Sequence, residues 1–327
     1  MHNYDLAPEL TATYIAQVWQ RLAPHVRPTL LLPAPRLSEL VGCDVLLASE
    51  TFQYTGSFKF RAAYQLLTSV PQRQIIAASS GNFGQAVAYA ARLLGKEATI
   101  VMPSTAARVK IEAVQAYGGR VELTDVRRVS RQERVAQLAR EQPEAFVAPA
   151  YDDYRVVAGN STLGQEILGT DPPDVLLVPV GGGGLISGQI IARDFLGCRT
   201  RIVGAEPLSA NDAARSLHSG RLLANATEPE TVADGARTLS LGQLNWEIIR
   251  RGAEEIIEVP DEVTLEALRL LFLLANLKAE PTGALALGAL LLQADRFRGQ
   301  RVCCIVSGGN VDPALYVQAL AGGSAPI

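Results

Sequence analysis

The sequence predicts an α/β fold with parallel sheets. From about residue 44 onward, short runs rich in Val, Ile and Leu alternate with stretches of helical periodicity. Several of the short runs are apolar throughout, which is typical of strands buried on both faces of a parallel sheet. Three glycine-containing turns each follow such a run and precede a helical stretch. In open α/β sheets, ligands bind at turns of this kind, at the carboxyl ends of the strands.

Nine segments have the composition of strands. They are residues 44–49, 74–79, 97–102, 120–124, 145–149, 174–180, 201–206, 255–260 and 301–307. Helical patterns lie between them, for example a pattern that ends at Gly95 and another from Val129 to Glu141. The periodicity alone does not decide whether these strands form one sheet or two.

Composition excludes several classes of function. Of the 327 residues, 48% are hydrophobic and 19% are charged, so the chain can bury a substantial core. The net charge of −3 gives no basic face, which argues against a nucleic-acid partner. The most apolar stretch, residues 268–277, is too short to cross a bilayer, and the N-terminus has no targeting signal. We therefore expect a cytoplasmic protein without a membrane partner.

Histidine and cysteine are too few and too scattered for common catalytic and zinc sites. The three histidines and four cysteines show no metal-ligand spacing, and none of the histidines lies in a motif. The cysteines are expected to be small buried side chains in a reducing compartment. A catalytic proton transfer would then need another base, for which a lysine is the natural candidate.

Gly181 to Gly184 form the glycine turn with the clearest physical purpose. Four glycines let the backbone approach a ligand closely, and their N–H groups, together with the N-terminus of the following helix, can bind a phosphate. The alternative is a tight turn that lets a helix pack on the sheet. Neither the dinucleotide motif nor the nucleoside-triphosphate motif is present, which favours a small phosphate-bearing cofactor.

Lys59 is the candidate reactive lysine. It lies between Phe58 and Phe60, where partial desolvation would lower the pKa of its amine and suit Schiff-base chemistry. Taken alone, a lysine at the start of a helix is more often a solvated residue.

Four motifs occur in a familiar order: TGSFKFRAA (55–63), SSGNFGQAVA (79–88), VPVGGGGLISG (178–188) and VSGGN (306–310). With them the chain resembles the fold-type II enzymes that use pyridoxal phosphate (PLP), and within these the serine/threonine dehydratase and serine racemase group. The resemblance implies two open parallel-sheet domains with flanking helices. The large, PLP-binding domain would comprise residues 1–70 together with 149–327, and the small domain residues 71–148. The family is usually dimeric, so a homodimer is expected.

The resemblance also implies roles for individual residues. Lys59 would hold PLP as a Schiff base and remove the Cα proton of the substrate, and Ser80 would face the substrate from the opposite side. Asn82 would bond the cofactor's 3′ oxygen, and Ser307 its pyridine nitrogen. The remaining expected cofactor contacts are Phe58, Gly181, Gly182, Gly183, Gly184 and Glu280, where Glu280 could equally be a helix cap. The expected substrate contacts are Ser79, Ser80, Gly81, Asn82, Phe83 and Tyr151.

Glu206, Ala210 and Asp212 match the divalent-metal site of the family. Two carboxylates and the carbonyl of Ala210, completed by water, would suit Mg²⁺ or Ca²⁺. The alternative is that Glu206 and Asp212 only cap a helix or form surface pairs.

The expected reaction is β-elimination from a small β-hydroxy amino acid, giving a 2-oxo acid and ammonia. A neutral hydroxyl at Ser307 makes the cofactor ring a weaker electron sink than a carboxylate would, which favours elimination. Phe83 replaces a usual His, and residues 158–162 read AGNST in place of AGQGT, so we expect a substrate other than plain serine or threonine. Racemisation or β-replacement on the same scaffold, a catalytically idle ligand-binding homologue and a nucleotide-binding protein remain alternatives, the last disfavoured by the missing motifs.

Overall fold

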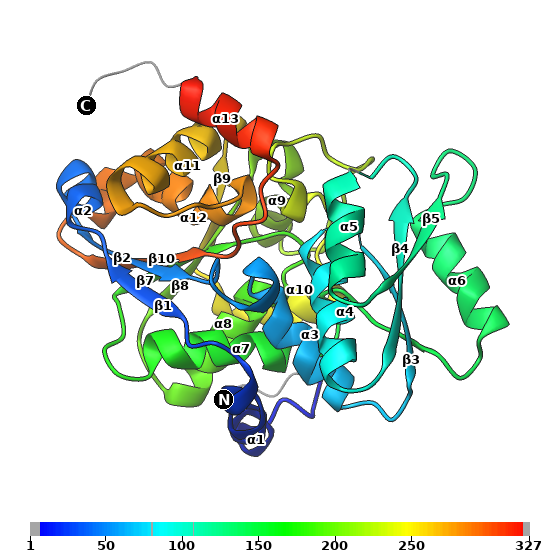
Figure 1. Ribbon diagram of the computed structural model, residues 1–327. Helices are drawn as coiled ribbons and strands as arrows, with labels where there is room; N and C mark the ends of the chain where they lie inside the picture. Colours follow the sequence, from blue (N-terminus) through cyan, green and yellow to red (C-terminus); the bar gives the residue numbers. More distant parts are fainter. Residues whose placement is uncertain (1–6, 80, 107, 323–327) are drawn as a thin grey trace.

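A computed structural model describes residues 7–79, 81–106 and 108–322 of the chain. The described residues form two sheets with helices packed around them, as Figure 1 shows. The mixed α/β class with parallel sheets and flanking helices is thus confirmed. No helix within these ranges is both long and apolar enough to cross a membrane.

The larger sheet has six strands in the order β1-β2-β10-β7-β8-β9. Every neighbouring pair in it is parallel except β1 with β2. Its strands are β1 (Leu30–Pro33), β2 (Asp44–Ser49), β7 (Val175–Pro179), β8 (Arg201–Pro207), β9 (Glu255–Val259) and β10 (Arg301–Val306).

The smaller sheet has four parallel strands in the order β5-β4-β3-β6. Its strands are β3 (Gln74–Ala78), β4 (Glu97–Pro103), β5 (Arg120–Thr124) and β6 (Phe146–Val147). All four come from one continuous stretch of the chain, and they lie on the right in Figure 1.

All nine segments predicted as strands contain one, but the sequence pattern missed β1. This strand is the antiparallel edge of the larger sheet, and three of its four residues are exposed. Leu30, Leu31 and Leu32 are apolar, but the run is only four residues long and lies between Pro28 and Pro33, so the pattern does not distinguish it from a loop.

Thirteen α-helices and five short 3₁₀ helices accompany the strands within the described residues. The α-helices are α1 (Ala12–Leu22), α2 (Pro35–Val41), α3 (Lys59–Thr68), α4 (Asn82–Leu93), α5 (Arg108–Ala116), α6 (Arg131–Glu141), α7 (Tyr154–Leu168), α8 (Gly184–Leu196), α9 (Asp212–Ser219), α10 (Gln243–Gly252), α11 (Asp261–Ala275), α12 (Pro281–Leu292) and α13 (Pro313–Ala321). The 3₁₀ helices are η1 (Ala23–His25), η2 (Tyr54–Gly56), η3 (Leu208–Ala210), η4 (Asp234–Ala236) and η5 (Ala294–Phe297).

Both faces of the larger sheet are covered, which explains why its inner strands are largely apolar. Successive side chains of a strand point to opposite faces. In β10, Cys303 packs into the core that includes α7, α8 and α10, whereas Cys304 packs into the core of α2, α11 and α12. A strand with a core on each side needs apolar residues at every position.

The turns that carry the sequence motifs meet where the two sheets approach each other. The turns after β2, β7 and β10 lie at the carboxyl ends of neighbouring strands of the larger sheet. The turn after β3 comes from the smaller sheet, and α4, which it opens, packs against α3 of the larger part. The site therefore draws residues from both sheets.

Candidate active site

Lys59 begins α3, immediately after the turn that follows β2. Its amine donates a hydrogen bond to the carbonyl of Ala150 at 3.2 Å and lies 5.1 Å from the ring centre of Phe58 and 5.6 Å from that of Phe83. Part of the side chain is exposed, but the amine lies among apolar neighbours. This desolvation lowers the pKa of Lys59 from 10.5 to about 8, against the opposing influence of Glu280. A larger fraction of the amine is therefore neutral, and so nucleophilic, than in a solvated lysine.

The glycine turn after β7 presents unused N–H groups. None of the N–H groups of Gly181 to Gly184 donates a hydrogen bond to any part of the chain that the structure describes. The carbonyls behave differently, because those of Gly182, Gly183 and Gly184 all accept hydrogen bonds. A row of free N–H groups at the start of α8 fits a phosphate group.

Two of these glycines are also required by the backbone and by packing. Gly183 has a φ of +89°, which favours glycine. A Cβ on Gly182 would lie 2.4 Å from the ring of Tyr151. The turn thus serves both of the purposes considered for it, since it is tightly packed on one side and bears free N–H groups.

Asn82 and Glu280 connect the two sheets. The Asn82 amide donates to Glu280 Oε1 at 2.7 Å and accepts from the amide of Asn310 at 2.8 Å. Glu280 is only 3% exposed, and burial, followed by the negative charge of Asp234, raises the pKa of its carboxyl to about 8. Glu280 is also the residue directly before α12, but its side chain makes no capping hydrogen bond to that helix.

Ser307 and Phe58 lie beside each other. The N–H of Phe58 donates to the carbonyl of Ser307 at 3.0 Å, and Ser57 forms a bridge with Gly308. Ser307 is buried, and its hydroxyl makes no hydrogen bond to a described residue. The hydroxyl is therefore available for a ligand.

The predicted substrate contacts after β3 lie in the turn before α4 and in the first residues of that helix. The N–H of Gly81 donates to the hydroxyl of Ser79, and Phe83 is buried with its ring toward Lys59. Ser80, predicted to face the substrate, lies outside the described residues. Tyr151 packs against the glycine turn, and burial, followed by the charge of Asp152, raises the pKa of its phenol. Tyr151 thus lies beside Gly182, in contact with the glycine turn.

Glu206 lies near the end of β8, Ala210 in η3 and Asp212 at the start of α9, and all three are buried. The Glu206 carboxylate accepts the N–H groups of Ala213 and Ala214 in the first turn of α9, so the capping alternative describes it well. Asp212 Oδ2 is buried without a partner among the described residues. Burial raises the pKa of Asp212 to about 6 and that of Glu206 well above its usual range. An unpaired buried oxygen of one carboxylate, close to a second carboxylate, fits a bound cation.

Within residues 7–79, 81–106 and 108–322, no group of three or more His, Cys, Asp and Glu side chains could hold a metal ion. The predicted site rests on two carboxylates and a carbonyl, so this finding does not bear on it.

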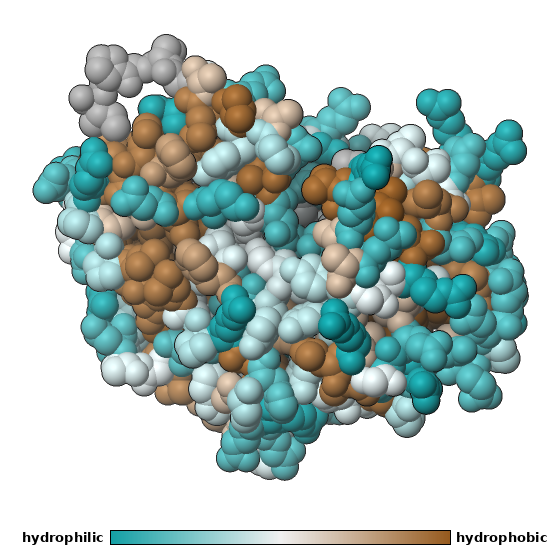
Figure 2. Space-filling model, in the orientation of Figure 1, coloured by the Kyte–Doolittle hydropathy of each residue, from teal (hydrophilic) through white to brown (hydrophobic). Residues whose placement is uncertain are grey.

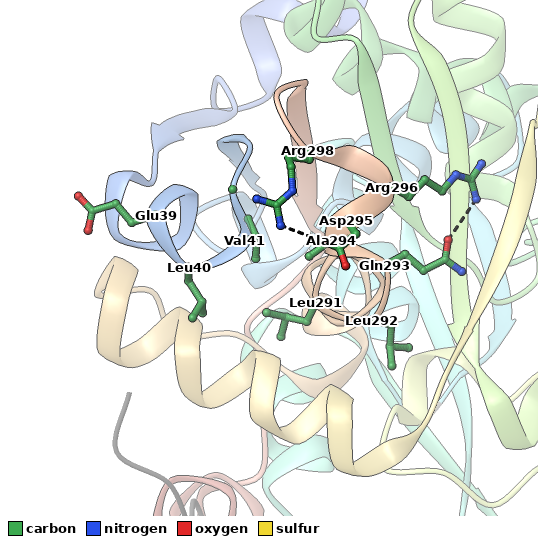
Figure 3. Close-up of a pocket in the computed structure, with 11 residues that line it drawn as sticks. Glu39, Leu40, Val41, Leu291, Leu292, Gln293, Ala294, Asp295, Arg296 and Arg298 are labelled. Carbon is green, nitrogen blue, oxygen red and sulfur yellow. Dashed lines mark hydrogen bonds and ion pairs between the residues drawn. The ribbon is translucent and has the colours of Figure 1, made fainter.

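None of the predicted site residues lines the surface pocket in Figure 3. It has a volume of about 540 Å³ and is lined by residues of α2, α12 and η5 and the turns beside them. Its arginines are already paired, Arg298 with Asp295 and Arg296 with Glu254. The pocket therefore offers little for an anionic ligand.

Sequence reasoning assigned no role to Asn310 or to Asn245. Asn310 ends the SGGN motif, and the motif itself was the available signal. Asn245 lies in α10 and donates hydrogen bonds to the carbonyls of Gly182 and Tyr151. A single asparagine in an amphipathic helix gives no such signal, because only the fold brings it behind the glycine turn.

An activated lysine, a phosphate-sized set of free N–H groups and a buried hydroxyl, at the edge where two parallel sheets meet, define an enzyme that works with a small phosphate-bearing cofactor. The comparison with family models identifies that cofactor. The model described as "Pyridoxal-phosphate dependent enzyme" matches residues 22–308, and the chain belongs to this family.

Relatives agree on the type of chemistry. The chain is 39% identical to an L-threo-3-hydroxyaspartate ammonia-lyase from Pseudomonas sp, over 93% of this chain and 96% of the relative. It is 33% identical to a serine racemase from Schizosaccharomyces pombe, over 94% of this chain and 96% of the relative. The chain is thus an enzyme related to ammonia-lyases and racemases.

Solved structures share the fold. The structure of threonine deaminase from T.th. has a TM-score of 0.86 and 40% sequence identity, covering 91% of this chain and 97% of that one. Maize serine racemase has a TM-score of 0.87 and 31% identity, covering 94% of this chain and 96% of the other. The resemblance to fold-type II PLP enzymes is therefore confirmed.

Proposed function

We propose that this protein is a PLP-dependent ammonia-lyase that removes the β-hydroxyl group and the amino group of a small β-hydroxy amino acid. The products would be a 2-oxo acid and ammonia. The observation that carries the proposal is the Lys59 amine, whose pKa of about 8 suits both a nucleophile and a proton acceptor. The ammonia-lyase relatives support the reaction type.

Different residues of the chain bind the cofactor and transfer the proton. The N–H groups of Gly181 to Gly184 hold the cofactor's phosphate, and Asn82 and Ser307 hold its ring. Bound PLP supplies an aldehyde that takes up the amino group and a ring that accepts electrons. Lys59 removes the proton from Cα of the substrate and returns a proton when the product leaves. Phe58 and Phe83 keep water from the amine.

The substrate we propose to test first is L-threo-3-hydroxyaspartate. The ammonia-lyase from Pseudomonas sp and a second one from Saccharomyces cerevisiae, 35% identical, are named for this compound. Its second carboxylate requires a cation near the site. Lys110, paired with Asp234, is close enough to Glu280 to lower the pKa of that carboxyl and provides such a charge. Phe83, in place of a usual histidine, accords with a substrate other than plain serine or threonine.

We also propose a structural or activating Mg²⁺ or Ca²⁺ ion held by Glu206, Asp212 and the carbonyl of Ala210. The unpaired Oδ2 of Asp212 supports it, because a buried carboxylate oxygen without a partner is costly. A cation there would favour the charged form of both carboxyls.

For the domain organisation, we propose a small domain of residues 71–148 that closes on a large domain of residues 1–70 and 149–327. The four strands of the smaller sheet all fall within residues 74–147, which supports this division.

A homodimer is part of the same proposal. Figure 2 shows apolar surface on the left of the molecule, where α2, α11 and α13 lie. The exposed large apolar residues of these helices are Leu40, Phe272, Leu273 and Val317. A contiguous apolar surface is typical of subunit contacts.

The four free cysteines, three of them buried, support a cytoplasmic location.

The test is a substrate panel on PLP-loaded protein. L-threo-3-hydroxyaspartate, L-serine, L-threonine and L-aspartate are each incubated with enzyme, and 2-oxo acid and ammonia are measured. We expect both products from hydroxyaspartate at a higher kcat/KM than from serine or threonine. Chiral analysis of the recovered amino acids detects racemisation. Racemised substrate without 2-oxo acid would replace the proposal by the racemase alternative, and full turnover of threonine would refute the substrate assignment.

A Lys110→Met variant tests the role of the cation. We expect it to lose kcat/KM for hydroxyaspartate while keeping that for serine. An equal loss for both substrates would contradict the role of Lys110 in recognition.

A further inference from the structure

Hydrogen bonds to the carbonyls of the glycine turn after β7 set the direction in which its N–H groups point. A peptide unit that turns its carbonyl one way points its N–H the other way. The carbonyls of Gly182, Gly183 and Gly184 are all held by hydrogen bonds within the protein, and the N–H groups of the turn are left free. Whatever holds these carbonyls therefore aims the N–H groups.

Asn245 is the side chain with the most connections behind the turn. It is fully buried in α10, and its amide donates to the carbonyl of Gly182 at 2.8 Å and to the carbonyl of Tyr151 at 3.1 Å. The N–H of Gly242, one turn earlier, donates to the same Gly182 carbonyl at 3.1 Å. The beginning of α10 is thus fastened to the glycine turn.

Residues 150–152 connect these contacts to the reactive lysine. The carbonyl of Ala150 accepts the bond from the Lys59 amine, and the next residue, Tyr151, is held by Asn245. The residue after that, Asp152, accepts the N–H groups of Gln243 and Leu244 at the start of α10. One amide side chain therefore fixes the phosphate turn and the backbone against which Lys59 rests.

The Asn245 amide has an unpaired side. Its Oδ1 is buried without a partner among the described residues. An unpaired buried polar atom lowers the stability of the fold. A leucine of similar volume would avoid this cost, so stability gives no reason for an asparagine here. The two donated bonds are the reason.

We propose that Asn245 is a positioning residue for the cofactor: it holds the Gly182 and Tyr151 carbonyls so that the N–H groups of the glycine turn face the cofactor's phosphate at a fixed distance from Lys59. The inference rests on the proposed PLP-dependent function of the site. Asn160, which holds the Gly184 carbonyl at 2.9 Å, has one such contact where Asn245 has two.

The experiment compares Asn245→Leu with a matched control, Gln65→Met. Gln65 is also a buried amide with two donated hydrogen bonds and an unpaired Oε1, but its partners are Tyr14 and Ser69, away from the turn. For wild type and both variants, full-length protein freed of PLP is titrated with PLP by equilibrium dialysis. The ³¹P NMR signal of the bound phosphate and the thermal midpoint of the PLP-free protein are also recorded.

We expect Asn245→Leu to weaken PLP binding at least tenfold and to shift the ³¹P signal, while its PLP-free thermal midpoint stays within the range of Gln65→Met. Unchanged PLP affinity would overturn the proposal, and so would a loss of affinity that merely parallels a loss of thermal stability in both variants. Should Asn245→Leu not fold, Asn245→Thr, which keeps one donor, is expected to lose less PLP affinity. Wild-type affinity in that variant would equally overturn the proposal. A wild-type protein that does not bind PLP would refute the proposed function itself.

Discussion

Replacing Glu280 by Gln is expected to change how the stability of the PLP-free protein depends on pH. The Glu280 carboxyl is buried, and its pKa is raised to about 8 from an ordinary value of 4.5. Between these two values the folded protein holds a proton that the unfolded chain has released. The free energy of unfolding therefore falls as the pH rises through this window.

The magnitude follows from the same shift. One proton held only in the folded state corresponds to about 1.4 kcal/mol per pH unit. Over the window from 4.5 to about 8, this group alone removes on the order of 5 kcal/mol from the free energy of unfolding. Gln keeps an oxygen that can accept the 2.7 Å bond from Asn82 but cannot ionise, so Glu280→Gln lacks this loss.

The assay is urea unfolding of PLP-free wild type and Glu280→Gln at pH 5, 6, 7 and 8. Other buried carboxyls, such as Glu206 and Asp212, titrate in both proteins and cancel in the difference. The advantage of the variant should grow with pH and reach several kcal/mol at pH 8. Glu266→Gln, at a half-exposed surface carboxylate, serves as the control and should give a flat difference. A flat difference for Glu280→Gln would refute the reasoning.

Four further outcomes test other parts of the site and its support. Lys59→Ala should abolish both the visible absorbance band of the lysine-bound cofactor and the release of 2-oxo acid; an unchanged band in an absorbance scan contradicts the assignment. Arg61→Met should lower the free energy of unfolding by about 3–5 kcal/mol in urea titrations, because it leaves the buried carboxylate of Glu50 without its partner; a loss below about 1 kcal/mol would show that the ion pair is dispensable. Gly182→Ala should destabilise the fold by about 1–3 kcal/mol and weaken PLP binding, since the new Cβ would meet the Tyr151 ring; an unchanged thermal midpoint speaks against this packing. Millimolar Mg²⁺ or Ca²⁺ should raise the thermal midpoint of wild type but not of Asp212→Asn, and equal midpoints with and without the ion would remove the metal from the proposal.

The fold was predictable where one physical requirement dominates the local sequence. Strands buried on both faces, such as β7 and all but the first residue of β10, are apolar along their buried length, and the sequence shows this directly. β1 is apolar too, but it is only four residues long and ends in Pro33, so its sequence does not identify it as a strand. The division into two sheets depends on which strands pair across long sequence separations, and periodicity contains no information about that.

The candidate site was predictable to the extent that its residues lie in contiguous motifs. Lys59, Asn82 and the glycine turn each belong to a motif that follows a strand. Asn245 and the pairing of Asn82 with Glu280 were not predictable, since their partners are brought together only by the packing of helices on the sheets. The raised pKa of Glu280 likewise results from burial, which the sequence EPTGA does not reveal.

The position of β10 in the larger sheet affects how the protein is made. β10, near the C-terminal end of the chain, pairs with both β2 and β7 and so completes the centre of the six-stranded sheet. On the ribosome, the strands of the smaller sheet are all synthesised by residue 147, whereas the second neighbour of β2, the strand β10, is synthesised more than 250 residues after β2. During that interval β2 can pair only with β1, and its other edge is left open, the kind of exposed strand edge that promotes aggregation. The pairing of β10 is therefore a late step that covers the open edge of β2.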